Sequence, residues 1–436
     1  MTNSTRVLSN TTATDPLGTA DVPVTFPEDF LWGTATASHQ VEGGNVGNDV
    51  WLYEHVTPTM YKESSADACD HYHRYREDIA LLASLGLNAY RFSLEWSRIE
   101  PAEGEFSAVA IEHYRDMLRA CHEHGLTPLV TYHHFTSPQW LIAKGGWESD
   151  ETPALFARFA RRVTQELGDL FETACTMNEP NLAILLGELG LAEKDPADRV
   201  KNPTWVGAGR ALGIPAEQVA GFQLSATEKS FEVKCAAHKA AVAAIKAVKP
   251  TMRVGWTLAN SDFHAAPGGE ERVARLIEEN NLRYLRVSEG DDFVGIQTYN
   301  RTLLGPDGPA PAPEGSLLNP QGEEIWPWAI GAVIRQAWDT VKVPIIVTEN
   351  GLNTADDAQR VDFLRTAIAE VGKCVSDGIP VGGYMCWSAM DNFEWIFGYG
   401  PKFGIIAVDR VTQERTLKES ARVLGEIARS NGAVLA

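Results

Sequence analysis

The chain has few cysteines, and they are dispersed. No CxxC motif and no Cys/His cluster occurs among its six cysteines, which are Cys69, Cys121, Cys175, Cys235, Cys374 and Cys386. Zinc sites and disulfide frameworks normally show such spacing. We therefore expect buried thiols, no metal site and no disulfide network.

Long hydrophobic runs are also missing. No segment approaches the roughly 18 uninterrupted apolar residues of a membrane-spanning helix. Residues 1–24 are rich in Thr, Ser and Asn and contain no apolar run of signal-peptide length, so we expect a flexible N-terminal tail. These absences predict a soluble protein with no membrane partner and a cytoplasmic location.

Positive charge is scarce. The chain carries 38 basic and 58 acidic residues, a formal net charge of −20. Such a charge repels phosphate backbones and anionic lipid surfaces. We therefore do not expect nucleic acid as a partner, and we expect a small-molecule substrate.

What the chain does contain is a regular alternation of β-branched or aromatic runs with amphipathic stretches, which is typical of repeated βα units. Residues 71–86 and 110–125 predict helices that stop at Gly86 and Gly125. The runs predict eight strands, the number that closes an α/β (β/α)₈ TIM barrel. They are residues 31–36, 89–93, 127–133, 173–178, 253–258, 293–299, 344–349 and 381–387.

No linker divides the chain, so we expect one catalytic barrel domain over residues 25–430 with decorated βα loops. The low-complexity stretch 305–320 follows the sixth predicted strand. It should be a loop on the C-terminal face of the barrel rather than a domain boundary.

Two carboxylates follow strand-like runs, Glu179 in TMNEPN and Glu349 in VTENG. The C-terminal ends of barrel strands are where such folds place catalytic groups. Two carboxylates on different strands can cleave a glycosidic bond, one giving a proton to the leaving oxygen and the other attacking or stabilising the anomeric carbon. At this point inversion, retention and a structural role all stay open.

Polar or aromatic side chains recur at the other predicted strand ends. For any single residue, packing or an ion pair is the common reason, but the recurrence indicates a ligand site. Sugars need amides and carboxylates for their hydroxyls and indoles for their apolar faces, and the chain has 12 Trp. The recurring residues are Gln40, Arg91, Glu95, His133, His134, Asn178, Asn260, Tyr299 and Trp387.

Several long motifs resemble the family 1 glycoside hydrolases, the β-glucosidase type, along nearly the whole chain. FPEDFLWGTATASHQVEGG resembles the N-terminal signature of that family, and TMNEPN and VTENG resemble its two catalytic segments. WSAMDNFEW followed by GYGPKFGI is similar to its C-terminal sugar-binding stretch. The resemblance implies a retaining β-glycosidase that acts on terminal β-D-glucosyl residues, with β-D-galactosyl and fucosyl residues left open, and without a metal or an organic cofactor.

The resemblance also implies a role for each matched residue. Glu179 would be the general acid/base and Glu349 the nucleophile, with their carboxyl groups about 5 to 5.5 Å apart. Arg91 would keep Glu349 ionised, and Tyr299 would hold it in place. The sugar would be bound by Gln40, His134, Asn178, Tyr299, Trp387, Glu394 and Trp395. His133 competes with His134 for one role in VTYHHFTSP, and alignment on the Pro favours His134.

The chain departs from the family pattern on the leaving-group side. IQTYN offers Gln297 and Thr298 where Asn and Tyr are usual, and Asn181 stands where a bulky aromatic is common. The aglycone preference therefore stays open. The alternatives are a transglycosidase of the same family, which transfers the glycosyl group to an alcohol instead of water, and a non-catalytic sugar-binding barrel, which is weakened because both glutamates are present.

Overall fold

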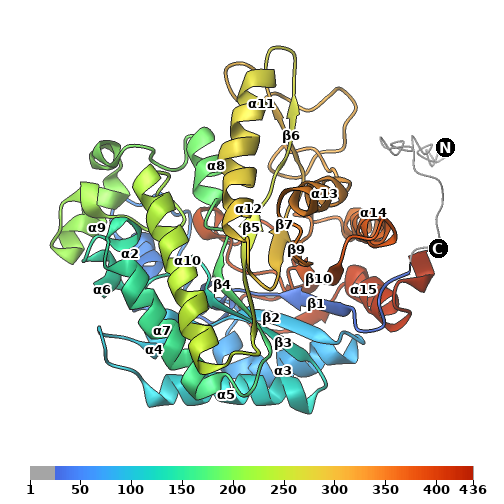
Figure 1. Ribbon diagram of the computed structural model, residues 1–436, viewed down its shortest axis with the longest axis horizontal. Helices are drawn as coiled ribbons and strands as arrows, with labels where there is room; N and C mark the ends of the chain where they lie inside the picture. Colours follow the sequence, from blue (N-terminus) through green and yellow to red (C-terminus); the bar gives the residue numbers. More distant parts are fainter. Residues whose placement is uncertain (1–24, 436) are drawn as a thin grey trace, which may run out of the picture.

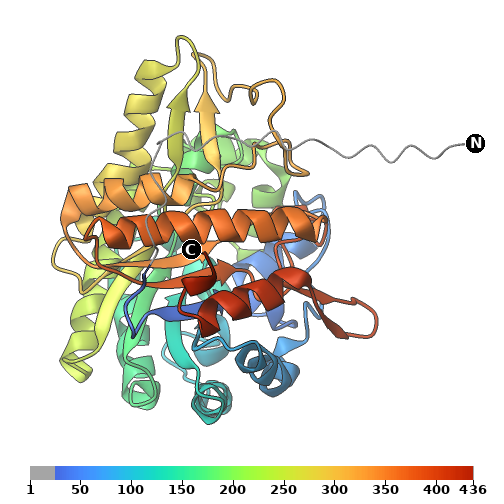
Figure 2. The ribbon, with the colours of Figure 1, turned by 90° about the vertical axis from the view of Figure 1, so that its right-hand side faces the viewer.

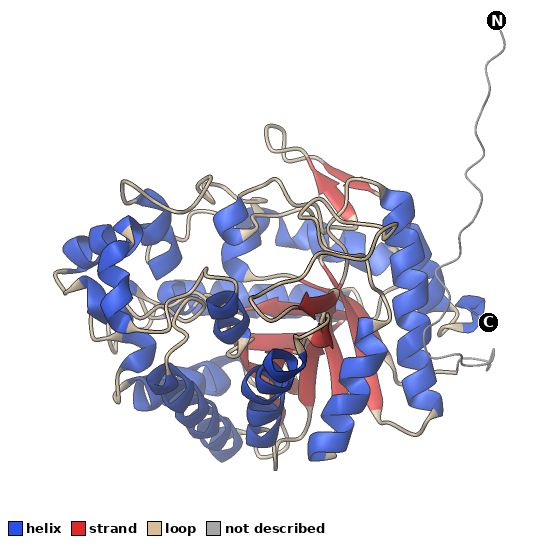
Figure 3. Cartoon of the chain, turned by 90° about the horizontal axis from the view of Figure 1, so that it is seen from above, coloured by secondary structure: helices blue, strands red, loops and turns tan. Residues whose placement is uncertain are grey.

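The structure is a computed structural model that describes residues 25–435, so the predicted tail over residues 1–24 lies outside the described residues. Eight parallel strands form a closed barrel in the order β1-β10-β9-β7-β5-β4-β3-β2, surrounded by helices (Figure 3). The strands are β1 Leu31–Ala35, β2 Ala89–Ser93, β3 Thr127–His133, β4 Thr173–Asn178, β5 Arg253–Ala259, β7 Val294–Gln297, β9 Ile345–Asn350 and β10 Val381–Trp387. The predicted (β/α)₈ barrel is thus confirmed, with strand bounds shifted by at most two residues.

A helix follows each barrel strand before the next one begins. These are α3 His71–Ser84, α5 Ala108–Glu123, α7 Thr152–Leu167, α10 Glu228–Val248, α12 Arg283–Val287, α13 Ala329–Val341, α14 Asp357–Ser376 and α15 Glu419–Arg429. The two helices predicted from the sequence are α3 and α5. Gly86 and Gly125 adopt φ values of 89° and 73°, which explains why the helices stop there.

Two apolar layers hold the barrel together. One lies between the strands and the helices and contains residues such as Val130 and Val347. Their neighbours Leu129 and Ile346 point to the other side of the sheet and join a separate cluster with Met385 inside the barrel. This alternation follows from the two-residue period of a strand. It leaves the inward positions near the C-terminal strand ends for polar side chains.

Short elements decorate the strand ends. They are α1 Ser38–Val41, α2 Asp49–His55, α4 Trp96–Ile99, α6 Gln139–Ile142, α8 Leu182–Glu188, α9 Pro203–Leu212 and the antiparallel pair β11 Ile406–Val408 and β12 Arg415–Leu417. None of the helices over residues 25–435 is long and apolar enough to cross a membrane.

One decoration projects from the barrel (Figures 1 and 2). It contains β6 Asp262–Ala265 paired in parallel with β8 Arg301–Leu304, and helix α11 Glu270–Leu276, which continues through a π-helical turn (Ile277–Leu282) into α12. The chain from Gly305 to Pro320, predicted to be a loop, forms no helix or extended strand, and neither does the chain from there to Trp328. Its Gln321 accepts a hydrogen bond from Asn353, which follows β9 on the C-terminal face.

Candidate active site

Glu349 is the centre of the site. It lies near the end of β9 and is 2% exposed. Arg91 Nη1 donates to Glu349 Oε1 at 2.6 Å, and the Tyr299 hydroxyl donates to Glu349 Oε2 at 2.6 Å. Each oxygen of the carboxylate is therefore fixed by a separate donor, and the two donors come from different parts of the barrel. The contacts expected between Glu349 and these two residues are present.

Arg91 is fully buried at the barrel axis. Its Nη2 donates to Asn178 Oδ1 at 2.6 Å, and its Nε donates to Thr131 Oγ1 at 3.1 Å. One guanidinium thus joins β2, β3, β4 and β9. A planar group with several fixed donors suits this position because it holds its partners in defined directions.

Glu179 stands immediately beyond β4 in a left-handed conformation with φ 47°. Its backbone N–H donates to Thr257 O at 2.8 Å, which ties this turn to β5. Left-handed backbone is uncommon for residues other than glycine and is concentrated at functional sites. The conformation brings the Glu179 carboxyl close enough for the charge of Glu349 to affect it.

The two carboxyl groups have different electrostatic surroundings. Burial, followed by the negative charge of Glu349, raises the pKa of Glu179 well above its usual range. Burial also raises the pKa of Glu349, but there the Arg91 guanidinium and the Tyr299 hydroxyl oppose the rise. Because Glu179 has no such hydrogen-bond donors among residues 25–435, we assign the proton of the pair to Glu179 and the negative charge to Glu349.

Gln40 and Glu394 meet on another side of the site. Gln40 is fully buried, and its Nε2 donates to Phe393 O at 2.8 Å and to Glu394 Oε2 at 3.3 Å. Burial and then the charge of Glu349 raise the pKa of Glu394 to about 8. An amide and a carboxyl that share a hydrogen bond can form hydrogen bonds to neighbouring hydroxyl groups of a ligand.

The structure separates the two adjacent histidines. The His134 ring stacks with the rings of Trp387 and Trp395 at centroid distances of 5.9 and 6.3 Å. His133 points the other way, where it packs against Trp147 and Phe222 in the layer between strands and helices. Burial lowers the pKa values of both, so both rings are neutral. Of the two, only His134 lies beside Trp387 and Trp395, the tryptophans predicted to bind sugar.

Several polar atoms at the strand ends are buried without a hydrogen-bond partner among residues 25–435. Buried polar atoms in proteins nearly always have partners, so such a group marks a place for a polar ligand. The atoms are Gln40 Oε1, His134 Nδ1, Asn178 Nδ2, Gln297 Oε1 and both side-chain polar atoms of Asn260. Three of these residues, Gln40, His134 and Asn178, are among the predicted sugar-binding residues.

Gln297 and Asn181, which depart from the family pattern, support the site through hydrogen bonds. Gln297 Nε2 donates to Asn178 Oδ1 at 3.0 Å and to Thr257 Oγ1 at 3.1 Å. The Asn181 amide donates to Ala259 O and to Asn280 O, at 2.8 and 2.9 Å, and so links α8 to the π-helical turn. The position of Gln297 at the end of a predicted strand indicates a role in the site. No sequence pattern indicates such a role for Asn181.

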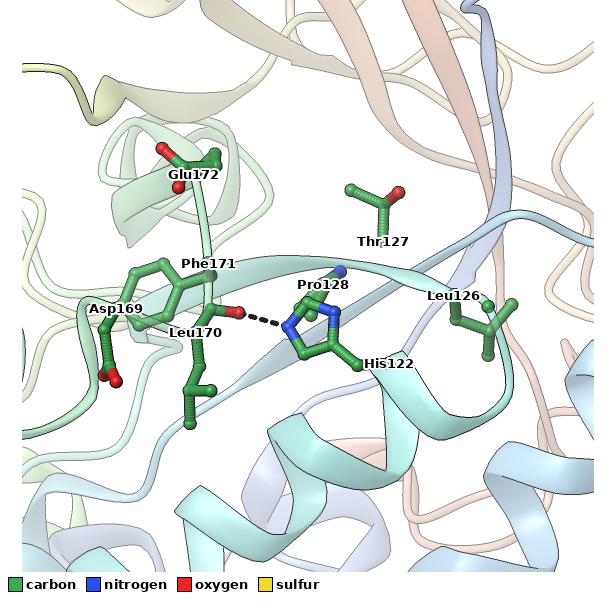
Figure 4. A pocket seen from close by; sticks show the side chains of 9 residues that line it. His122, Leu126, Thr127, Pro128, Asp169, Leu170, Phe171 and Glu172 are labelled. Carbon is green, nitrogen blue, oxygen red and sulfur yellow. Dashed lines mark hydrogen bonds between the residues drawn. The ribbon is translucent and has the colours of Figure 1, made fainter.

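No group of three His, Cys, Asp or Glu side chains that could hold a metal occurs within residues 25–435. A separate surface pocket lies between α5 and the chain segments that enter β3 and β4 (Figure 4). Its lining includes Thr127 at the start of β3 and Glu172 just before β4. These residues lie at the N-terminal strand ends, so this pocket is at the opposite face of the barrel from Glu179.

Comparisons with known proteins agree with this geometry. Residues 22–275 and 318–433 match glycosyl hydrolase family 1. Beta-glucosidase A of Thermotoga maritima is 31% identical, over 93% of this chain and 98% of its own length. The crystal structure of the beta-glycosidase BGL167 is similar with a TM-score of 0.92 and 61% identity, covering 93% of this chain and 97% of that one.

A third comparison is with the structure of a complex. The beta-glucosidase from Thermotoga maritima in complex with deoxynojirimycin has a TM-score of 0.81 and 28% identity, and covers 94% of this chain and 99% of that one. The unmatched segment of the family comparison, residues 276–317, includes the π-helical turn, β8 and part of the projecting loop.

A closed (β/α)₈ barrel with two buried glutamates at its C-terminal strand ends has the fold and the pair of carboxyl groups that enzymes cleaving glycosidic bonds use. The similarity extends along most of the chain and includes relatives above 30% identity. The chain belongs to glycosyl hydrolase family 1. Retention of the anomeric configuration is general to this family.

Proposed function

We propose that the protein is a retaining β-glycosidase that hydrolyses terminal, non-reducing β-D-glucosyl residues. The observation that carries this proposal is the different environment of the two glutamates. Glu349 is held by Arg91 and Tyr299 as an anion, and Glu179 lies nearby without such donors and keeps a proton. A retaining glycosidase needs this pair, one nucleophile and one acid.

In the first step, Glu349 attacks the anomeric carbon and Glu179 gives its proton to the departing glycosidic oxygen. The bond between the anomeric carbon and that oxygen breaks as the ester between the sugar and Glu349 forms. Esterification removes the negative charge of Glu349, so the pKa of Glu179 falls. Glu179 can then take a proton from water, which attacks the anomeric carbon and releases both the sugar and the Glu349 carboxylate.

The sugar would be held by the predicted binding residues. Asn178 presents its free Nδ2 beside Glu349, which suits the 2-hydroxyl group of the sugar. Gln40 and Glu394 would bind hydroxyls on the other side of the ring, with His134 next to them. Trp387 and Trp395 supply the apolar faces on which a sugar ring packs.

The test uses a panel of nitrophenyl β-glycosides with the wild type and Glu349→Gln, with and without acceptor alcohols. We expect turnover of the β-D-glucoside by the wild type and a loss of about a thousandfold or more in the variant, because the covalent step is removed. β-D-Galactosides and β-D-fucosides are the further glycones to compare. Alkyl glycosides formed from an acceptor alcohol would indicate transfer.

Two additional measurements separate the alternatives. NMR of the first product formed should show the β-sugar, since double displacement retains configuration; an initial α-sugar would mean inversion. Sugar binding without turnover of any β-glycoside would favour a non-catalytic barrel. The cytoplasmic location and the absence of a nucleic-acid partner remain predictions, which cell fractionation and a nucleic-acid binding assay would test.

A further inference from the structure

Lys234 is a buried lysine on the inner face of α10, the helix that packs against β4 and β5 (Figure 1). It is 1% exposed, and its Nζ donates to Pro180 O at 3.2 Å and to Ser225 O at 3.4 Å. Nζ also lies 4.8 Å from the centre of the Phe222 ring. No carboxylate within residues 25–435 forms an ion pair with it.

A buried lysine without an ion pair lowers the stability of the folded protein. Moving an ammonium out of water costs several kcal/mol unless an opposite charge compensates. Burial accordingly lowers the pKa of Lys234 to about 7. An apolar residue would fill this place between helix and barrel without that cost. An apolar residue would, however, leave the carbonyl oxygens of Pro180 and Ser225 without this donor, so the reason for a lysine here lies in these two contacts.

The explanation lies in what Lys234 contacts. Pro180 directly follows Glu179, and having no N–H of its own it can be held through its carbonyl oxygen. The peptide N–H of Glu179 is bonded to Thr257 O, and Asn181 is bonded through its side chain to β5. The hydrogen bond from Lys234 lies between these two contacts. It is made to the peptide that joins the left-handed turn at Glu179 to helix α8.

We propose that Lys234 is a positioning residue that holds the carbonyl of Pro180 and so keeps the Glu179 carboxyl directed at the leaving oxygen. The proposal rests on the function proposed above, in which Glu179 is the acid. An amine suits the task because Nζ carries several N–H donors and so reaches both Pro180 O, at 3.2 Å, and Ser225 O, at 3.4 Å, beside the ring face of Phe222. Lys234 forms no hydrogen bond or ion pair with Glu179 or Glu349 within residues 25–435.

The leaving group of the substrate tests this role. Cleavage of a phenyl β-D-glucoside needs proton transfer from Glu179, whereas the 2,4-dinitrophenolate of a dinitrophenyl β-D-glucoside leaves without it. A displaced Glu179 carboxyl should therefore slow the cleavage of the phenyl glucoside only. In Lys234→Met, we expect kcat/KM for the phenyl glucoside to fall about tenfold or more and that for the dinitrophenyl glucoside by less than about threefold. The ratio of the two values is the readout.

Lys249→Met is the matched control. Lys249 caps the other end of the same helix, and its Nζ donates to Gly168 O and Phe171 O at 2.8 and 3.0 Å, next to the pocket in Figure 4. It also holds backbone carbonyls, but at the N-terminal strand ends. We expect its ratio of kcat/KM values to equal that of the wild type.

Lys234→Gln provides a second variant in case Lys234→Met does not fold, because it keeps a neutral N–H donor. Its ratio should lie between those of the wild type and Lys234→Met. An equal fall for both glucosides, or an unchanged ratio in whichever variants fold, would overturn the proposal. A wild type that cleaves neither glucoside would instead refute the proposed function, so the two failures are distinguishable.

Discussion

The Tyr299 hydroxyl lies 2.6 Å from Glu349 Oε2, and it reaches that oxygen from beyond the end of β7. The hydrogen bond fixes the carboxylate on the side that Arg91 does not occupy. It also helps to stabilise the negative charge that attacks the sugar. The proposed nucleophile is thus aligned by one neutral and one charged donor.

Removing the Tyr299 hydroxyl tests this alignment. In Tyr299→Phe we expect kcat/KM for aryl β-glucosides to fall by about 10- to 100-fold, since a hydrogen bond to a charged group contributes about 1.5–3 kcal/mol. Tyr132→Phe is the control, because its buried hydroxyl bonds to Thr164 at 2.8 Å between strand and helix. Equal activity of the two variants would contradict the role of Tyr299.

Replacing Arg91 should change the pH profile. The Arg91 charge lowers the pKa of Glu349, so Arg91→Met should raise that pKa. Since Glu349 must be ionised to attack, the acid limb of kcat/KM should move to higher pH and the maximum should fall. Arg415→Met is the control, as Arg415 pairs with buried Asp78 at 2.8 Å elsewhere. An acid limb that stays in place would count against this assignment.

The alkaline limb should belong to Glu179. Glu179 must be protonated to act as acid, and burial with the charge of Glu349 raises its pKa. Activity should therefore persist above the usual pKa of a glutamate and fall as pH rises through the raised value. In the wild type this limb should appear in kcat/KM for a phenyl glucoside, which needs the acid, and should be absent for a dinitrophenyl glucoside, which does not. If the limb survives, another group titrates there.

Substitution of the two adjacent histidines, His133 and His134, should affect different properties of the protein. His134→Ala should lower kcat/KM with little effect on unfolding, because His134 faces the tryptophans of the sugar site. His133→Ala should cost about 2–4 kcal/mol of unfolding free energy, because it leaves a cavity between Trp147 and Phe222. Urea denaturation and kinetics on the same preparations measure both effects. The reverse pattern would exchange the two roles.

Strand positions and strand-end residues were predictable because both follow from local chemistry. β-Branched runs located the barrel strands, and the rule that barrel sites gather at the C-terminal strand ends selected Arg91, Asn178 and Glu349. The choice between His133 and His134 needed family resemblance, since adjacent strand residues face opposite sides and the sequence does not state which side is inward.

Other features depend on contacts that no local pattern encodes. The bond from Asn181 to Asn280 spans 99 residues, and that from Lys234 to Pro180 spans 54. The π-helical turn and the parallel pair β6 and β8 are similar cases: their backbone is set by neighbours that meet only after the barrel closes. Propensity is a weak guide at such positions because tertiary packing overrides it.

Asp49 gives a prediction about stability. It is buried, and its Oδ1 accepts hydrogen bonds from the N–H groups of Ser137 and Val50 at 2.8 and 3.0 Å. Burial is the main cause that raises its pKa from 3.8 to about 7. Between these values the folded state keeps a proton that the unfolded state has lost, so stability contributed by Asp49 is present at pH 3.8 and is lost as pH rises to 7.

Asp49→Asn keeps both acceptor contacts and cannot ionise. Its unfolding free energy relative to the wild type should therefore rise between pH 4.5 and pH 8, by an amount of the order of 2–4 kcal/mol. Urea denaturation at the two pH values measures the difference, with Asp291→Asn, next to His238, as a second carboxyl for comparison. A difference independent of pH would show that Asp49 is ionised in the folded protein.

The guanidinium that bonds Glu349 also bonds groups on β3 and β4. Closure of the barrel and the hydrogen bonding of Glu349 are therefore coupled, because a strand displaced by even one residue would withdraw a donor from this carboxylate. A partly opened barrel would be inactive before it lost its secondary structure. Activity is then the most sensitive available probe of whether these strands are in register.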